Sequence, residues 1–163
     1  MKRFIALVML FSLLLSGCST SGEWIKEPVT FYYVQRDYQK DMEQVIVSEV
    51  REASGHRNDL PYLLALYSMG PSSEELESPF PRNTSILPTE RTPYSIELTL
   101  SKSAAAMTDS SLTLASACIA LTCMELTDVQ QVSVVCGDRN ITIREDNLLL
   151  FMTNTPDVQE ETK

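Results

Sequence analysis

The segment 94–100 limits the fold of this chain more than any other. Its apolar and polar residues alternate strictly, with Tyr94, Ile96, Leu98 and Leu100 at the apolar positions. This period of two is typical of a strand that buries one face and exposes the other to water. A sheet of this kind is covered on one side by helices or further strands, so a layered fold is expected.

A long helix is predicted to follow, capped by Asp109, Ser110 or Ser111 and running to about residue 125. Drawn as a helix, its core face carries Leu112, Ala115, Ile119, Cys123 and Leu126. A second apolar set lies roughly opposite and consists of Leu114, Ala117, Leu121 and Met124. Two arrangements explain a helix that is apolar on two sides. Either it lies between two layers of the domain, or the second set forms an interface with a partner.

The remaining elements complete an α+β pattern. Strands are predicted over 29–34 and 44–52, the second from the spacing of Val45, Val47 and Val50, and a helix over 59–69 with Asn58 or Asp59 as N-cap. The segments 35–43 and 72–83 are expected to be loops. A further strand is expected over 84–90, where Pro88 indicates an edge or a bulge. Three more are expected over 131–136, 141–144 and 148–152, and residues 137–140 are expected to form the turn between the first two of them. The order β-β-α-β-β-α-β-β predicts a mixed sheet covered by two helices.

The N-terminus predicts an exported, lipid-anchored protein. Lys2 and Arg3 precede an apolar run over 4–15, and Leu15-Ser16-Gly17-Cys18 resembles a lipobox. As a helix the run rises about 18 Å, short of the roughly 30 Å hydrocarbon core, which favours a cleaved signal over a permanent span or a core helix. The expected division is a signal over 1–17, lipidated Cys18 and a tether over 18–27, one domain over 28–152, and a disordered acidic tail over 153–163.

Charge limits the partners of the mature chain. Loss of Lys2 and Arg3 with the leader changes the formal net charge from −9 to −11. So acidic a protein is not expected to bind nucleic acid, and a basic surface cannot attach it to anionic lipids. Attachment is therefore expected through acyl chains on Cys18, at the extracytoplasmic face of the cell membrane. Trp24 and Ile25 in the tether either pack on the domain or contact the membrane interface.

Three further cysteines, Cys118, Cys123 and Cys136, lie outside the cytoplasm if the leader is a signal, where disulfides are allowed. Cys118 and Cys123 are about 8.6 Å apart on one helix, which is too far for a disulfide. Cys123 and Cys136 fall on the predicted core faces of adjacent elements, so a disulfide between them is allowed. Buried free thiols are the alternative. No metal site is expected, since no Cys-x-x-Cys spacing occurs and His56 is the only histidine.

Catalytic motifs are missing from the sequence. It contains no Gly-x-Ser-x-Gly, no His-Glu-x-x-His and no glycine-rich phosphate loop. His56 occupies a polar loop before a helix, where a solvated turn residue is expected rather than a general base. A thiol at Cys118 is one remaining candidate for catalysis, and hydrolysis by carboxylates alone is the other. The sequence therefore predicts neither an enzyme nor a cofactor.

Three segments between about Leu60 and Arg144 resemble the GerMN domain. They are Tyr62-Leu63-Leu64-Ala65-Leu66 with Gly70-Pro71-Ser72 and Phe80-Pro81-Arg82-Asn83-Thr84; Ile96-Glu97-Leu98-Thr99-Leu100-Ser101; and 117–126 with Thr127-Asp128-Val129-Gln130-Gln131-Val132 and Gly137. Two positions depart from the family pattern. Arg82-Asn83 stands where a glycine usually precedes the threonine, and Cys136 stands where an ordinary apolar residue is common. A single copy of the domain is evident.

The resemblance implies an α+β fold similar to the ring-building motifs of sporulation and secretion complexes, with no catalytic residues. The expected function is assembly in the cell envelope, including sporulation or spore germination, by binding other envelope or spore-associated proteins or further copies of the chain. The alternative is a lipoprotein that binds a small ligand in a pocket between helix and sheet.

Overall fold

The strands form two sheets with a long helix between them. The computed structural model describes residues 27–37 and 44–152. The first sheet is antiparallel, with the order β2 (Ile46–Glu52), β1 (Pro28–Gln35), β3 (Leu76–Glu77). The second has the order β4 (Ile86–Arg91), β5 (Ser95–Leu100), β6 (Gln131–Cys136), β7 (Arg139–Arg144) and is mixed, because β5 and β6 are parallel. The signal, Cys18, the tether up to residue 26 and the tail lie outside the described residues.

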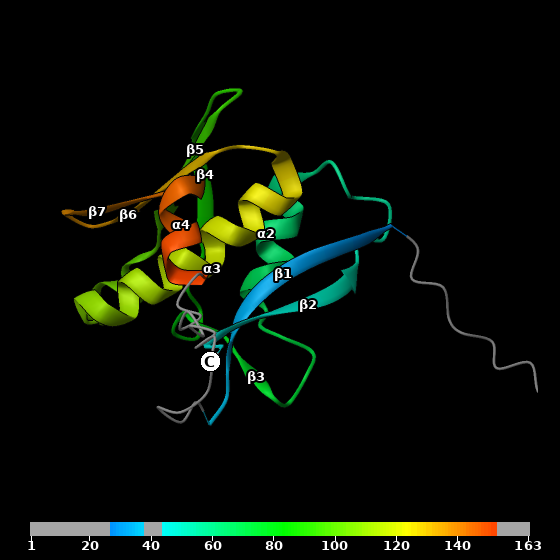
Figure 1. Ribbon diagram of the computed structural model, residues 1–163, viewed down its shortest axis with the longest axis horizontal. Coiled ribbons are helices and arrows are strands. Elements are labelled where there is room, and N and C mark those ends of the chain that lie inside the picture. Colours follow the sequence, from blue (N-terminus) through cyan, green and yellow to red (C-terminus); the bar gives the residue numbers. More distant parts are fainter. Residues whose placement is uncertain (1–26, 38–43, 153–163) are drawn as a thin grey trace, which may run out of the picture.

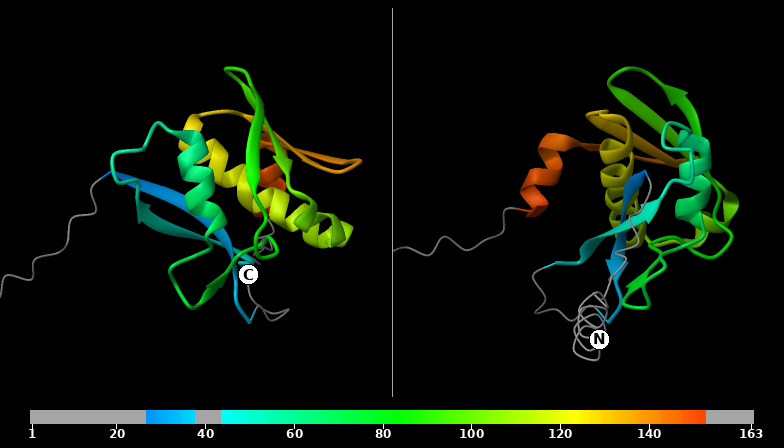
Figure 2. Two further views of the ribbon diagram at one scale, coloured as in Figure 1. Left: turned by 180° about the vertical axis from the view of Figure 1, so that it is seen from behind. Right: turned by 90° about the vertical axis from the view of Figure 1, so that its right-hand side faces the viewer.

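Helix α3 (Asp109–Thr127) connects β5 to β6, preceded by the short 3-10 helix η1 (Lys102–Ala106). It contacts β1 of the first sheet on one side and β6 and β7 of the second sheet on the other (Figure 1). Helices α2 (Leu60–Ser68) and α4 (Glu145–Met152) lie on opposite sides of α3 (Figure 2). By length and composition α3 would also pass as a membrane span, but half of that stretch is buried inside this fold.

One edge of β1 pairs with β2, and side chains of α2 and α3 form hydrogen bonds with the backbone at the other edge. The backbone N–H of Tyr32 donates to Thr122 Oγ1 at 3.0 Å, and the Tyr67 hydroxyl donates to the Tyr32 carbonyl at 2.9 Å. In an antiparallel strand both polar groups of a residue point to the same side, so these two bonds satisfy the free side of Tyr32. The Tyr67 ring also stacks on Tyr33, with centroids 4.8 Å apart, in the middle of the core.

The inward face of β2 carries charged side chains that hold the end of α2. Glu49 accepts hydrogen bonds from the backbone N–H groups of Ser72 and Ser73, the shortest at 2.8 Å. Arg51 donates to the carbonyl of Gly70 at 3.0 Å. The sequence left Val50 open as a third apolar position beside Val45 and Val47, but the Val50 side chain is 52% exposed and does not belong to the buried face.

The second sheet follows the sequence pattern closely. Ile96, Leu98 and Leu100 of β5 are buried, as the alternation predicted. Pro88 lies both in an edge strand and at a shift in the β4–β5 register. Gly137, with φ of +66°, and the residue after it make the turn between β6 and β7, because Cys136 already pairs with Arg139. The hairpin turn is therefore shorter than the four residues expected.

The α+β class is confirmed, and the structure corrects several boundaries. The strands form two sheets rather than one. A two-residue strand, β3, interrupts the loop expected over 72–83 because it pairs with the end of β1. The cap of α3 is Thr108, whose Oγ1 accepts from the N–H of Ser111, and not one of the three residues expected. The strand expected over 148–152 is instead part of α4, whose first turn carries Glu145 and Asp146. Acidic residues stabilise a helix start, and a short apolar run alone does not distinguish strand from helix.

Candidate functional site

The apolar second set on α3 is mostly used inside the fold. Ala117 is buried, and Leu114, Leu121 and Met124 are half-buried, the last two against the core. The helix is apolar on two sides because it lies between two sheets, the first of the two arrangements considered. The second arrangement, a partner interface at these four positions, stays a prediction, and burial leaves only part of their apolar surface for it. What remains accessible is a strip along the edges of Leu114, Leu121 and Met124.

The three cysteines of the domain are free and buried. Cys136 lies near the start of α3, because Arg139 Nη2 is 3.7 Å from Cys136 Sγ while Arg139 Nη1 is 3.3 Å from Asp109 Oδ1. Cys123 lies roughly 20 Å further along the helix axis than Asp109, at 1.5 Å per residue. The Cys123–Cys136 pair is therefore not bridged, and the alternative of buried thiols holds.

Burial also makes these thiols poor nucleophiles. It raises the pKa of Cys118 and of Cys123 from 9.0 to about 12. A thiol must lose its proton to attack a substrate, so neither residue has the chemistry of a catalytic cysteine at neutral pH. His56, the other residue considered, stacks on Tyr62 with ring centroids 4.1 Å apart and lies 3.7 Å from Asp59. Within the described ranges no group of His, Cys, Asp and Glu side chains could hold a metal ion.

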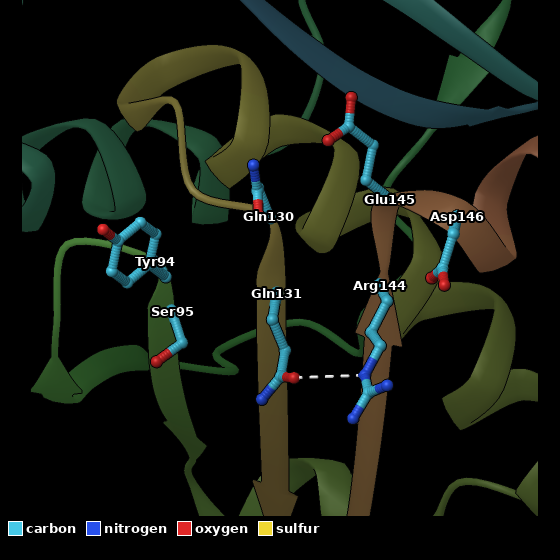
Figure 3. A pocket seen from close by; sticks show the side chains of 7 residues that line it. All are labelled: Tyr94, Ser95, Gln130, Gln131, Arg144, Glu145 and Asp146. Carbon is cyan, nitrogen blue, oxygen red and sulfur yellow. Dashed lines mark hydrogen bonds between the residues drawn. The ribbon is translucent and has the colours of Figure 1, made fainter.

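An open depression of about 550 Å³ lies where β5 and β6 begin and β7 ends. Its lining residues come from three places that are far apart in the sequence: Tyr94 and Ser95, Gln130 and Gln131, and Arg144, Glu145 and Asp146. Tyr94 stands on one side and Asp146 on the other, with the two glutamines between them (Figure 3). The volume falls within the range of about 300–1,000 Å³ that is usual for small-molecule sites.

The backbone around this depression is held by hydrogen bonds across the three strands. The carbonyl of Tyr94 accepts from the N–H groups of Gln130 and Gln131 at 3.0 and 3.2 Å. The N–H of Glu145 donates to the carbonyl of Gln130 at 3.0 Å, so the start of α4 is joined to the start of β6. Arg144 Nε donates to Gln131 Oε1 at 3.2 Å, which orients both side chains (Figure 3). The backbone of the lining and the Gln131–Arg144 pair are therefore held in place without a ligand.

Sequence reasoning missed this site. It placed Tyr94 on the buried face of its strand, whereas Tyr94 precedes β5 and is 71% exposed. It also expected a ligand pocket between helix and sheet, whereas this depression lies at the end of the second sheet. The two glutamines, Gln130 exposed and Gln131 half-buried, gave no signal, because amide side chains are common on surfaces. The seven residues meet only because β5 and β6 are parallel neighbours and β7 turns into α4.

Comparison with solved structures returns similar folds from two bacteria. The tandem GerMN domains of the sporulation protein GerM from Bacillus subtilis are 22% identical, with a TM-score of 0.48 over 69% of this chain and 39% of that one. A protein described as a lipoprotein, from Clostridium perfringens, is 12% identical, with a TM-score of 0.41 over 74% of this chain and 88% of that one. No family profile and no curated protein sequence matches the chain.

The first of these structures is described as GerMN domains, the domain that the three sequence segments resemble. This chain spans about two fifths of the length of the tandem-domain structure, with 39% of that chain covered. The position where GerMN sequences usually have glycine is occupied by Asn83, which adopts φ of +64°. Asparagine tolerates the left-handed region better than most residues, so this departure from the family pattern keeps the backbone conformation that glycine would allow.

Proposed function

We propose that this chain is a lipid-anchored protein of the cell envelope that acts by binding other envelope proteins, not by catalysis. The observation that carries the proposal is a lipobox close to a folded domain. Cys18 lies ten residues before β1 begins at Pro28, so a tether of this length reaches at most about 33 Å. Acyl chains on Cys18 would keep the domain near the outer surface of the membrane.

The chemistry of the described residues supports a binding role. The thiols of Cys118 and Cys123 keep their protons at neutral pH because they are buried. In the depression the Ser95 hydroxyl lies 2.8 Å from the hydroxyl of Thr92, not beside a histidine or lysine base. A serine nucleophile needs such a base to activate it. The resemblance of three sequence segments to the GerMN domain favours the same role and makes sporulation the first condition to compare.

The anchor is tested by growing cells with an alkyne-labelled fatty acid and following the full-length chain. We expect label on the wild-type chain in the membrane fraction, and no label on a Cys18→Ala variant. Ser19→Ala is the matched control and should be labelled like the wild type. Equal labelling of the wild-type and Cys18→Ala chains would refute the anchor.

The binding role is tested by crosslinking the tagged full-length protein in intact cells, comparing growing with spore-forming cultures. We expect the same envelope proteins to be recovered in repeat experiments with the wild type, and not with Cys18→Ala, which lacks the acyl attachment. Recovery of no specific protein in either culture would contradict the proposal. A second candidate function, ligand binding, is favoured by the depression at the end of the second sheet.

A further inference from the structure

Tyr94 has the features of a preformed aromatic platform. Three hydrogen bonds hold its backbone. Its N–H donates to Thr92 Oγ1 at 3.2 Å, and its carbonyl accepts from the N–H groups of Gln130 and Gln131. Its side chain is nevertheless 71% exposed. Burial of a tyrosine ring is worth a few kcal/mol, so an exposed ring on a backbone that is held in place leaves apolar surface available to a ligand.

The other lining residues offer hydrogen-bond donors and acceptors to a ligand. Gln131 and Arg144 bond to each other through Oε1 and Nε, which leaves the Gln131 amide N–H groups and the outer Arg144 nitrogens directed at the depression or at water. Gln130, Glu145 and Asp146 are exposed and add an amide and two carboxylates. Such planar groups bind ligands that carry many hydroxyls, because each hydroxyl both donates and accepts.

The lining carries charges of both signs, so a ligand whose charges are all of one sign meets a like charge within it. Arg144 lies within salt-bridge distance of no carboxylate in the described part of the chain, so it would repel a cation. Glu145 and Asp146 would repel an anion, as would a chain of formal net charge −9. A neutral ligand avoids both penalties. It would have to present an apolar face to Tyr94 and hydroxyls to the glutamines and carboxylates.

Sugar rings have this combination of an apolar face of C–H groups and an equatorial ring of hydroxyls. We propose that the depression formed by Tyr94, Gln130, Gln131, Arg144 and the start of α4 binds a neutral saccharide, with one sugar ring stacked on Tyr94. The proposal does not depend on the partner-binding function. It assigns a second activity to the same domain, at a depression whose lining includes no residue of α3.

The test uses the full-length protein in a zwitterionic detergent, because detergents with sugar headgroups would compete. Short neutral oligosaccharides of N-acetylglucosamine, glucose and galactose are each added, and binding is followed by saturation-transfer NMR and by calorimetry. Tyr94→Ala and Gln130→Ala remove the proposed contacts and leave the backbone hydrogen bonds of both residues in place. Tyr94→Phe retains the ring. Tyr62→Ala is the matched aromatic control, since Tyr62 is also partly exposed but stacks on His56 elsewhere.

We expect at least one oligosaccharide to bind the wild type, with a dissociation constant raised about tenfold or more by Tyr94→Ala, equivalent to about 1.4 kcal/mol. Gln130→Ala should weaken binding less, and Tyr94→Phe and Tyr62→Ala should bind like the wild type. Failure of every oligosaccharide to bind would overturn the proposal, and so would unchanged binding by Tyr94→Ala. Binding of spermidine or citrate, but of no sugar, would assign the depression to a charged ligand and also overturn it.

Discussion

At the scale of single residues, the hydroxyl of Thr122 holds the two halves of the core together. It donates to the carbonyl of Cys118 one turn earlier at 3.0 Å, and accepts the N–H of Tyr32 from β1 at 3.0 Å. Thr122 is fully buried, so no water can replace it. The sequence shows a threonine among apolar helix residues and gives no indication that a strand edge needs it as an acceptor.

Replacing Thr122 by valine keeps the shape of the side chain and removes its hydroxyl. We expect Thr122→Val to lower the free energy of unfolding by about 1–3 kcal/mol, because the Tyr32 N–H loses its partner where water has little access. Urea denaturation followed by circular dichroism measures this change.

The control is Thr113→Val, on an exposed part of the same helix. Thr113 makes the same bond to a carbonyl one turn earlier, that of Asp109, at 2.8 Å. Its replacement should change the free energy of unfolding by no more than about 0.5 kcal/mol. Equal losses in the two variants would show that the bond to Tyr32 contributes nothing.

At the scale of elements, β2 and α4 show where local patterns fail. In β2 the inward positions after Val47 are Glu49 and Arg51, because the face is covered by the polar backbone at the end of α2 and not by an apolar layer. In α4 the apolar run after Leu148 is as compatible with a strand as with a helix. The acidic first turn favours a helix start, and the helix that forms contacts β7. Neither outcome follows from periodicity.

The carboxylate of Glu49 should stabilise the connection between α2 and β3. We expect Glu49→Ala to lower the free energy of unfolding by about 1–2 kcal/mol, the lower part of the range for bonds to a charged group because Glu49 is only half-buried. Faster hydrogen exchange should appear at the amides of Ser72 and Ser73, which mass spectrometry of peptic peptides can locate. Glu52→Ala, on the exposed face of the same strand, should alter neither quantity. Unchanged exchange in Glu49→Ala would contradict the role given to this carboxylate.

At the scale of the whole molecule, the buried thiols couple folding to pH. The pKa values of Cys118 and Cys123 are raised by burial from 9.0 to about 12. Below about pH 9 both states hold these protons, so the thiols leave the stability independent of pH. Between about pH 9 and 12 the unfolded chain binds fewer protons than the folded one, and the free energy of unfolding falls as the pH rises.

We therefore expect alkaline unfolding in that range, with a smaller loss of stability in a Cys118→Ala, Cys123→Ala double variant. Thermal unfolding across the pH range measures the slope for each chain. Both chains share the tyrosines, whose titration is a common background. A double variant that loses stability as steeply as the wild type would contradict the coupling. Rapid reaction of the native cysteines at positions 118 and 123 with a thiol reagent at neutral pH would contradict their burial.

The sequence alone was sufficient for the elements whose signals are local. Alternation placed β5 and β6, and capping residues and the Gly-Pro sequence placed α2. The lipid anchor proposed at Cys18 stays a prediction from a linear motif. Only the tertiary structure decided the division into two sheets, the role of the second apolar side of α3 and the place of Tyr94 in a depression. The physical reason is that burial and hydrogen bonding depend on what lies opposite a residue in space. For Tyr94 those neighbours are the residues at 130–131 and 144–146, which no local pattern connects to it.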